Sequence, residues 1–120
     1  MGAPRLLTLV LDPSDPPGRL GDWLTDAGLE LDVRDLAAGD PLPDDLSGHA
    51  GLLVLGGGMG ANDDDVAPFL PAVRALLRTA AAAEVPPLGI CLGHQLHAAA
   101  NGGVVRRSPD GPELGAALVA

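Results

Sequence analysis

The sequence predicts an α/β protein with a doubly wound, mostly parallel sheet and helices on both of its faces. Three observations predict this fold. Short, nearly continuous apolar runs alternate with segments of helical spacing, as in parallel sheets that are covered on both sides. Turns rich in glycine and proline separate these segments. The 120 residues, of which 47% are apolar, allow one domain with a modest core.

The first half of the chain predicts a strand, a helix and a second strand. Residues 5–11 form an apolar run that is typical of a buried strand. Residues 18–27 have helical spacing, and Gly28 follows as the stop of that helix. The apolar face of the helix consists of Leu20, Trp23, Leu24 and Ala27. Residues 29–36 alternate apolar and charged side chains, which predicts a strand nearer the edge of the sheet.

The second half repeats the alternation of strand and helix. We expect a buried strand at residues 51–55, followed by a glycine-rich loop at residues 56–60 and a helix at residues 68–83. A third buried strand at residues 88–90 and a helix at residues 92–100 follow. Pro68 and the acidic run before it suit the positive end of the longer helix. We expect two further strands to begin at residues 104–105 and within residues 114–120.

Composition and charge exclude several classes of function. The formal net charge is -9, and the seven basic residues are all arginines, so nucleic acid and anionic membranes are poor partners. No apolar run reaches the length that spans a membrane, and no signal peptide is recognisable. A single cysteine excludes an internal disulfide. We therefore expect a cytoplasmic protein.

Residues 89–93 place the single cysteine, Cys91, between a strand and a helix with a glycine on either side. Composition alone favours a buried structural cysteine. The flanking glycines and the strand-to-helix context instead favour a nucleophile elbow, where a tight turn pushes the nucleophile into the crevice. The following helix would favour the thiolate, and the backbone N–H of Leu92 would become one donor to an oxyanion.

The glycine loop at residues 56–60 has three interpretations. The first is an oxyanion loop whose backbone N–H groups face the elbow. The second is an ordinary tight loop. The third is a dinucleotide fingerprint, Gly56-x-Gly58-x-x-Ala61, which is the weakest because the carboxylates of residues 63–65 intervene before any helix. We interpret those carboxylates as a solvated helix cap, not as a metal site. Consequently the sequence predicts neither a metal nor a cofactor.

Arg106 and Arg107 are interpreted as a solvated strand end, with an anion site as the lesser alternative. They follow the predicted strand at residues 104–105 directly.

Two motifs resemble the class I (triad) glutamine amidotransferases. The run Cys-Leu-Gly-His-Gln at residues 91–95, preceded by Leu-Gly-Ile at residues 88–90, resembles the family's elbow signature. Residues 53–59 resemble the family's oxyanion strand and loop, and the spacing between the motifs also fits. The resemblance covers nearly the whole chain but about the first half of the family's flavodoxin-like domain. Residues 1–120 are therefore expected to be a partial glutamine amidotransferase domain.

The resemblance implies a substrate and a mechanism. Cys91 would attack the side-chain amide of glutamine, form a glutamyl thioester and release ammonia. Gly57 and Leu92 match the positions whose backbone N–H groups stabilise the oxyanion. Gln95 matches a position that holds the glutamine, and Met59 lies beside that pocket. The family also implies a synthase partner or a fused synthase domain that receives the ammonia.

The chain departs from the family at the general base. The family's general base is a histidine two residues before a glutamate, and no His-x-Glu occurs here; the histidines present are His49, His94 and His97. The chain alone is therefore expected to be inactive.

Two alternative functions follow. One is a catalytically dead, amidotransferase-like binding module, which the missing base supports. The other is a DJ-1/PfpI-like cysteine hydrolase. The run Leu-Gly-His-Gln after Cys91 argues against it, because this run resembles amidotransferases and not that group. Half a domain would also leave a sheet edge and apolar faces uncovered, so we expect marginal stability or association with another surface.

Overall fold

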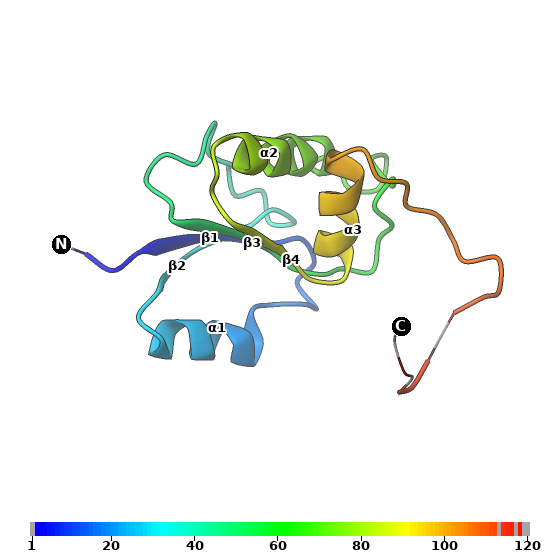
Figure 1. Cartoon of the computed structure of the whole chain (residues 1–120), viewed down its shortest axis with the longest axis horizontal. Helices are drawn as coiled ribbons and strands as arrows, with labels where there is room; N and C mark the ends of the chain where they lie inside the picture. The colour runs from blue at the N-terminus through cyan, green and yellow to red at the C-terminus, as the bar shows by residue number, and fades with distance from the viewer. Residues whose placement is uncertain (1, 113, 117, 119–120) are drawn as a thin grey trace.

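The computed structural model describes residues 2–112, 114–116 and 118. Four strands form one parallel sheet in the order β2-β1-β3-β4. The strands are β1 (Arg5–Val10), β2 (Glu30–Asp35), β3 (Gly51–Val54) and β4 (Pro87–Gly89). Helix α1 (Gly18–Asp26) lies on one face, whereas α2 (Leu70–Ala82) and α3 (Leu92–Ala100) lie on the other (Figure 1). The predicted doubly wound α/β fold is confirmed.

Strand β1, helix α1 and strand β2 form where the sequence patterns predict them. Gly28 follows α1 with φ 97°, and its N–H donates to the carbonyl of Thr25 while Leu29 N–H donates to Leu24. This left-handed residue closes the helix, as the sequence predicts. Among the described strands, β2 pairs with β1 alone and lies at an edge of the sheet, which its alternating pattern also predicts.

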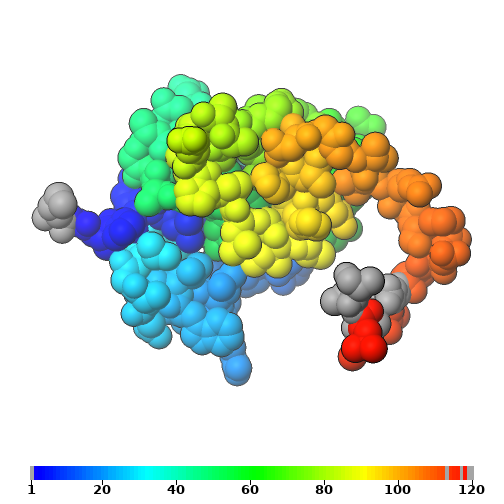
Figure 2. Space-filling view, in the orientation of Figure 1, coloured from blue at the N-terminus to red at the C-terminus, as the bar shows by residue number. Residues whose placement is uncertain are grey.

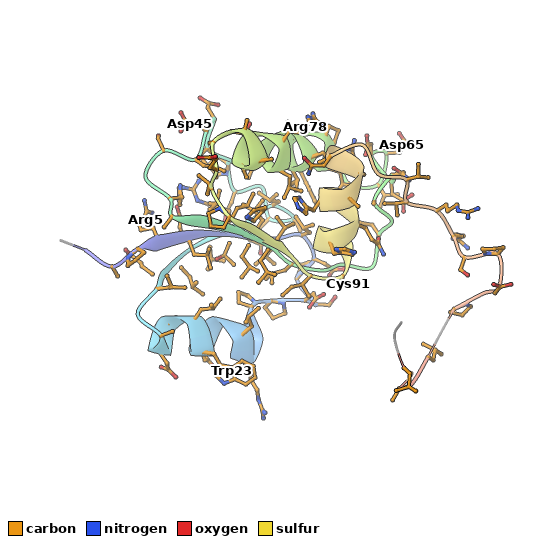
Figure 3. All side chains as sticks on the ribbon, in the orientation of Figure 1. Arg5, Trp23, Asp45, Asp65, Arg78 and Cys91 are labelled. Carbon is orange, nitrogen blue, oxygen red and sulfur yellow. The ribbon has the colours of Figure 1, made fainter. Side chains whose placement is uncertain are left out.

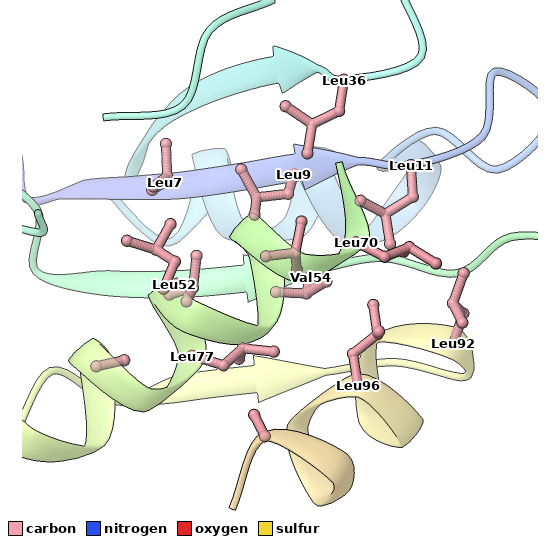
Figure 4. Close-up of a cluster of buried hydrophobic side chains, with 14 of the residues drawn as sticks. Leu7, Leu9, Leu11, Leu36, Leu52, Val54, Leu70, Leu77, Leu92 and Leu96 are labelled. Atoms are coloured by element: carbon pink, nitrogen blue, oxygen red, sulfur yellow. The ribbon is translucent and has the colours of Figure 1, made fainter. Parts of the chain in front are cut away.

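The larger core lies between the sheet and the helices α2 and α3. Helix α2 begins at Leu70, two residues later than predicted, because residues 67–70 still form a turn in which Leu70 N–H donates to Ala67. Its buried residues recur at helical spacing: Leu70, Val73, Leu76, Leu77 and Ala80. They meet the leucines of β1 and β3 and Leu96 of α3 (Figure 4).

A smaller core lies under α1. Leu20 and Leu24 pack against Leu53 and its buried neighbours in the sheet. Trp23, predicted on the same face, is 63% exposed and points away from the sheet (Figure 3). The prediction for Trp23 is wrong because the short helix meets the sheet through Leu20, Leu24 and the buried Gly21, and the indole lies off that face.

The face of β4 next to α1 is uncovered. Leu88 is 52% exposed and Ile90 is 38% exposed, so the strand predicted to be buried is an edge strand with one open face. An apolar groove of about 310 Å³ runs here, and its lining includes Leu24, Leu53 and Leu88. Helix α1 does not extend over β4, which explains the exposure.

The strand predicted at residues 104–105 does not form. Val104 is 85% exposed, and the carbonyl of Val105 accepts a hydrogen bond from the side chain of Asn62. Within the part of the chain that the structure describes, no neighbouring strand pairs with this segment. After α3 the chain leaves the body as an extended arm (Figure 2). In the range 114–120, the described residues 114–116 and 118 are not in a strand, and the others lie outside the described residues.

Candidate functional site around Cys91

Three strand ends meet at one edge of the sheet. The strands are parallel, with Leu9 opposite Val54 and Val54 opposite Gly89, so their carboxyl ends lie together. Asp12 follows β1, the glycine loop at residues 56–60 follows β3, and Cys91 follows β4. Ligand sites of open α/β sheets occur at this edge.

Cys91 occupies a strained turn between β4 and α3. Its backbone has φ 55° and ψ -111°, a conformation that residues with a side chain rarely adopt. The turn is held by Gly93 N–H donating to Ile90 at 2.9 Å and Gln95 N–H donating to the carbonyl of Cys91 at 3.1 Å. The thiol is exposed, at the amino end of a nine-residue helix. This is the backbone geometry expected of the predicted elbow.

The two glycines that flank the turn leave no room for a side chain. A Cβ at Gly89 would stand 2.5 Å from the carbonyl oxygen of Gly93. A Cβ at Gly93 would collide with the carbonyl oxygen of Val54 in β3. Helix and strand can therefore approach this closely only because both positions are glycine.

The glycine loop packs directly against the Cys91 turn. A Cβ at Gly56 would lie 3.3 Å from the Cβ of Cys91. A Cβ at Gly57 would lie 3.1 Å from Cδ2 of Leu92 and 2.7 Å from the sulfur of Met59. The fold therefore brings the predicted residues Gly57, Met59, Cys91 and Leu92 together.

The backbone N–H groups of Gly57 and Leu92 are unused hydrogen-bond donors. Among the residues that the structure describes, neither N–H donates a hydrogen bond to a protein acceptor. Their neighbours do donate: Gly58 N–H donates to Asp12, and Gly93 N–H donates to Ile90. Two unused donors near an exposed thiol can donate hydrogen bonds to a negatively charged oxygen.

Asp12 holds the glycine loop and was missed by the sequence reasoning. Its Oδ2 accepts the Gly58 N–H at 3.0 Å, and its Oδ1 accepts from the hydroxyl and the N–H of Ser14 at 2.7 and 2.9 Å. The Ser14 hydroxyl, followed by the two backbone N–H groups, lowers the pKa of Asp12 below its ordinary value. A usable signal was its position immediately after a predicted buried strand.

A cavity of about 480 Å³ lies between the glycine loop, the first turn of α3 and residues 105–107. Both residues predicted to bind substrate, Met59 and Gln95, line it, and Gln95 lies on the first turn of α3. Its other lining residues are Gly58, Gly60, Asn62, Asp63, Val105, Arg106 and Arg107. Arg106 and Arg107, interpreted from the sequence as a solvated strand end, therefore face the cavity that contains the predicted substrate residues.

The acidic run after the loop is structural at two positions. Asp63 Oδ2 accepts the N–H of Gly60 at 2.7 Å, and Asp64 forms a two-pronged ion pair with Arg74 of α2 at 2.9 and 2.7 Å. The hydrogen bonds from Arg74 lower the pKa of Asp64. The run is therefore not simply a solvated cap, because Asp64 ties the loop to α2. Within the described residues, no group of three metal-ligating side chains could hold a metal.

The histidines have partners other than the thiol or lie exposed. His49 is buried before β3, where its Nε2 lies 2.8 Å from Oδ2 of Asp32. His97 contacts Asn101 at 3.2 Å, and His94 is exposed on α3. Among the residues that the structure describes, no hydrogen bond joins a histidine to Cys91.

The fold and these contacts define a class of protein: a parallel α/β domain in which a cysteine on a strained strand-to-helix turn faces a glycine loop. The chain belongs to the class-I glutamine amidotransferase family, whose sequence profile matches residues 23–119.

Solved structures agree with this assignment. The chain is 39% identical to a glutamine amidotransferase from Methylobacillus flagellatus, with a TM-score of 0.81 over 91% of this chain and 43% of the other. It is 30% identical to a glutamine amidotransferase from Thermotoga maritima, with a TM-score of 0.85 over 96% of this chain and 50% of the other. The chain thus spans about half of these relatives or less. No curated protein is significantly similar in sequence. No helix in the described ranges is both long and apolar enough to span a bilayer.

Proposed function

We propose that this chain carries the nucleophile side of a glutamine amidotransferase site, in which Cys91 cleaves the side-chain amide of glutamine. The observation that supports it best is the strained, exposed Cys91 beside the unused N–H groups of Gly57 and Leu92. A thiol and two oxyanion donors on one small surface are what acyl transfer requires.

In the first half-reaction, the sulfur of Cys91 attacks the amide carbon of glutamine. The S–C bond forms while the amide oxygen takes up negative charge between the N–H groups of Gly57 and Leu92. The C–N bond then breaks, and the nitrogen takes a proton and leaves as ammonia. The glutamyl group remains on the sulfur as a thioester.

In the second half-reaction, water adds to the thioester carbon and the S–C bond breaks. Glutamate is released, and the sulfur of Cys91 regains its initial state. Both halves need a group that moves protons. His49 is buried against Asp32, and the 120 residues contain no His-x-Glu, so we assign the base to a segment outside this chain.

The ammonia acceptor lies outside the chain as well. A synthase, either a partner protein or a fused domain, would consume the ammonia. We expect these reactions in the cytoplasm, because a single exposed thiol stays reduced in that compartment.

A catalytically dead binding module is the second candidate, and the missing base favours it. Such a module would bind glutamine at the same surface without cleaving it. An assay of ammonia release from glutamine by the 120-residue chain gives background in both cases. Release above background would show that a base is present after all.

The covalent step gives the decisive test. We expect the glutamine analogue 6-diazo-5-oxo-L-norleucine to modify Cys91 in a saturable manner, and L-glutamine to compete with it. Mass spectrometry locates the adduct, and Cys91→Ser is the control that removes it. Iodoacetamide labelling without any labelling by the analogue would contradict the proposal, because it would show a reactive thiol without a glutamine site.

A further inference from the structure

We propose that Asp15 controls the charge of Cys91: its unpaired carboxylate disfavours the thiolate while no cation is present and favours a cation beside the sulfur. Asp15 is then a positioning residue that acts through Cys91, and the sulfur becomes fully reactive only when a cationic group lies next to it. The inference rests on the proposed function for the identity of that group, which is the base after it has taken the proton of the thiol.

The carboxylate of Asp15 lies beside the Cys91 turn. A Cβ at Gly56 would collide with Oδ2 of Asp15 and stand 3.4 Å from its Cγ, and the same point lies 3.3 Å from the Cβ of Cys91. The carboxylate and the base of the cysteine side chain therefore adjoin one small space, which a glycine leaves open. Two side chains that follow β1 and β4 are thereby neighbours across the end of β3.

A tight turn after β1 fixes the position of Asp15. Its N–H donates to the carbonyl of Asp12 at 2.9 Å, and the side chain of Asp12 is itself bonded to the glycine loop. Pro16 and Pro17 follow, and their rings restrict the backbone between this turn and α1. The segment therefore holds the Asp15 carboxylate at the edge of the sheet where the thiol lies.

The charge of Asp15 has no protein partner in the part of the chain that the structure describes. Neither of its side-chain oxygens accepts a hydrogen bond there, whereas those of Asp12 accept three. Asp15 also lacks an arginine partner among these residues, unlike Asp64, which pairs with Arg74. An unpaired carboxylate keeps its full acceptor capacity for a donor that enters the space beside the thiol.

The other charged and titratable groups around Cys91 do not offset this charge. The glycine loop and β4 carry none. On α3, His94 follows three residues after Cys91 and is exposed. Asp63 and the arginines at residues 106–107 line the neighbouring cavity, to which Asp15 does not contribute. Two opposed influences therefore act on the sulfur: the amino end of α3 favours the thiolate, and Asp15 disfavours it.

The same carboxylate has opposite effects before and after the base arrives. Alone, it raises the free energy of a thiolate on Cys91, because two negative charges lie close together. A neutral nitrogen base that takes the thiol's proton becomes a cation: the S–H bond breaks, an N–H bond forms, and the total charge is unchanged. This cation then lies near two anions, so Asp15 stabilises the ion pair. Reactivity of the sulfur is thereby coupled to the presence of the base.

The first measurement compares two charged thiol reagents on the 120-residue chain. One methanethiosulfonate carries a trimethylammonium group and the other a sulfonate, and the thiolate of Cys91 displaces methanesulfinate from either to form a mixed disulfide. The ratio of the cationic to the anionic rate reports the electrostatic potential at the sulfur, whatever the thiolate fraction. Asp15→Asn should lower this ratio about fourfold at low ionic strength, because removing one nearby charge changes each rate about twofold in opposite directions.

The second measurement is the pH dependence of alkylation by uncharged iodoacetamide. Asp15→Asn should react about twofold faster than the wild type at pH 7 and reach half of its maximal rate at a lower pH. High salt should shrink the difference, since it screens exposed charges. Asp15→Glu keeps the charge and should resemble the wild type. Asp45→Asn removes an equal charge far from Cys91 (Figure 3) and should also follow the wild type.

A wild-type rate ratio and a wild-type pH profile in Asp15→Asn would overturn the inference. An equal change in Asp45→Asn would do so too, because the effect would then come from net charge. A change in Asp15→Asn that high salt leaves untouched would assign it to the shape of the turn and would equally overturn the inference.

Failure of the proposed function looks different. If Asp15→Asn changes the rate ratio but the diazo analogue never modifies Cys91, the control of charge stands and the glutamine chemistry falls. If the analogue modifies Cys91 while Asp15→Asn and Asp45→Asn behave alike toward the charged reagents, the glutamine chemistry stands and the role of Asp15 falls.

Discussion

The carboxylate of Asp12 accepts the backbone N–H of Gly58 at 3.0 Å, and this one bond joins the end of β1 to the loop after β3. It occupies the N–H that follows Gly57, whereas the Gly57 N–H donates to no protein acceptor among the described residues. The loop is rich in glycine and would otherwise be mobile. Asp12 is therefore a positioning residue for the proposed oxyanion donor.

Asp12→Ala should slow the modification of Cys91 by the diazo analogue about tenfold, because a displaced donor stabilises the oxyanion poorly. Alkylation by iodoacetamide, which needs no oxyanion donor, should not change. Asp22→Ala, an exposed carboxylate of α1, is the matched control. A pH effect is expected in the wild type. Because the pKa of Asp12 is lowered, its carboxylate is charged at neutral pH, and its hydrogen bond to Gly58 weakens only as the pH falls through that lowered value. Equal rates of modification by the diazo analogue in Asp12→Ala and wild type would show that the glycine loop keeps its position without Asp12.

Gly93→Ala should destabilise the chain by about 3 kcal/mol, because the added methyl group collides with the backbone of Val54 and neither segment can rotate away. Gly89→Ala should behave similarly, since its clash is with the backbone of Gly93. Gly2→Ala is the control, with open space around it. Urea denaturation followed by circular dichroism measures all three. A loss of stability in Gly93→Ala no larger than in Gly2→Ala would mean that α3 does not approach β3 as closely as described.

The sequence alone predicts the local part of the site well. Gly89 and Gly93 around Cys91 indicate a tight strand-to-helix turn, and the structure has that turn. The order of apolar runs predicts the parallel sheet, which in turn brings the glycine loop and Cys91 to the same edge. These features depend on residues close in sequence or on the general rule that parallel strands end together.

Contacts between distant residues could not be predicted in the same way. The bond from Gly58 to Asp12 depends on β1 and β3 being neighbours, which no local pattern states. Residues 104–105 have strand propensity but no adjacent strand in the described structure, so propensity gives the wrong result. Arg106 and Met59 line the same cavity, and the contact between Asn62 and Val105 that joins their two segments is also invisible in the sequence.

Cys91→Gly should make the chain more stable than Cys91→Ala does, by about 1 kcal/mol, because glycine adopts φ 55° without steric cost and alanine does not. Both variants lack the thiol, so the comparison isolates the backbone. The midpoint of urea unfolding at constant slope is the measurement. If the two variants unfold at the same urea concentration, the turn stores no strain and the proposed presentation of the thiol loses its physical basis.

A second group of charges, far from Cys91, makes stability depend on pH. Asp32 is largely buried and receives hydrogen bonds from Arg34 and Arg5, and His49 lies 2.8 Å away. The hydrogen bonds of Arg34, followed by that of His49, hold the pKa of Asp32 well below its usual range. Asp32→Asn should therefore cost about 2 kcal/mol at pH 7, since it leaves charged donors without their anion.

The sign of the pH effect follows from the lowered pKa of Asp32. The Asp32 carboxylate binds protons less readily in the folded than in the unfolded chain. Its contribution to the free energy of unfolding is therefore complete above the pKa of an unfolded aspartate, about 4, and is lost as the pH falls below that pKa. Thermal unfolding of the wild type and of Asp32→Asn between pH 7 and pH 3 should show two melting temperatures that converge at the acidic end. Asp22→Asn should follow the wild type throughout. Parallel curves for the wild type and Asp32→Asn would mean that the ionised carboxylate adds nothing to folding, and that burial of His49 beside it rests on packing alone.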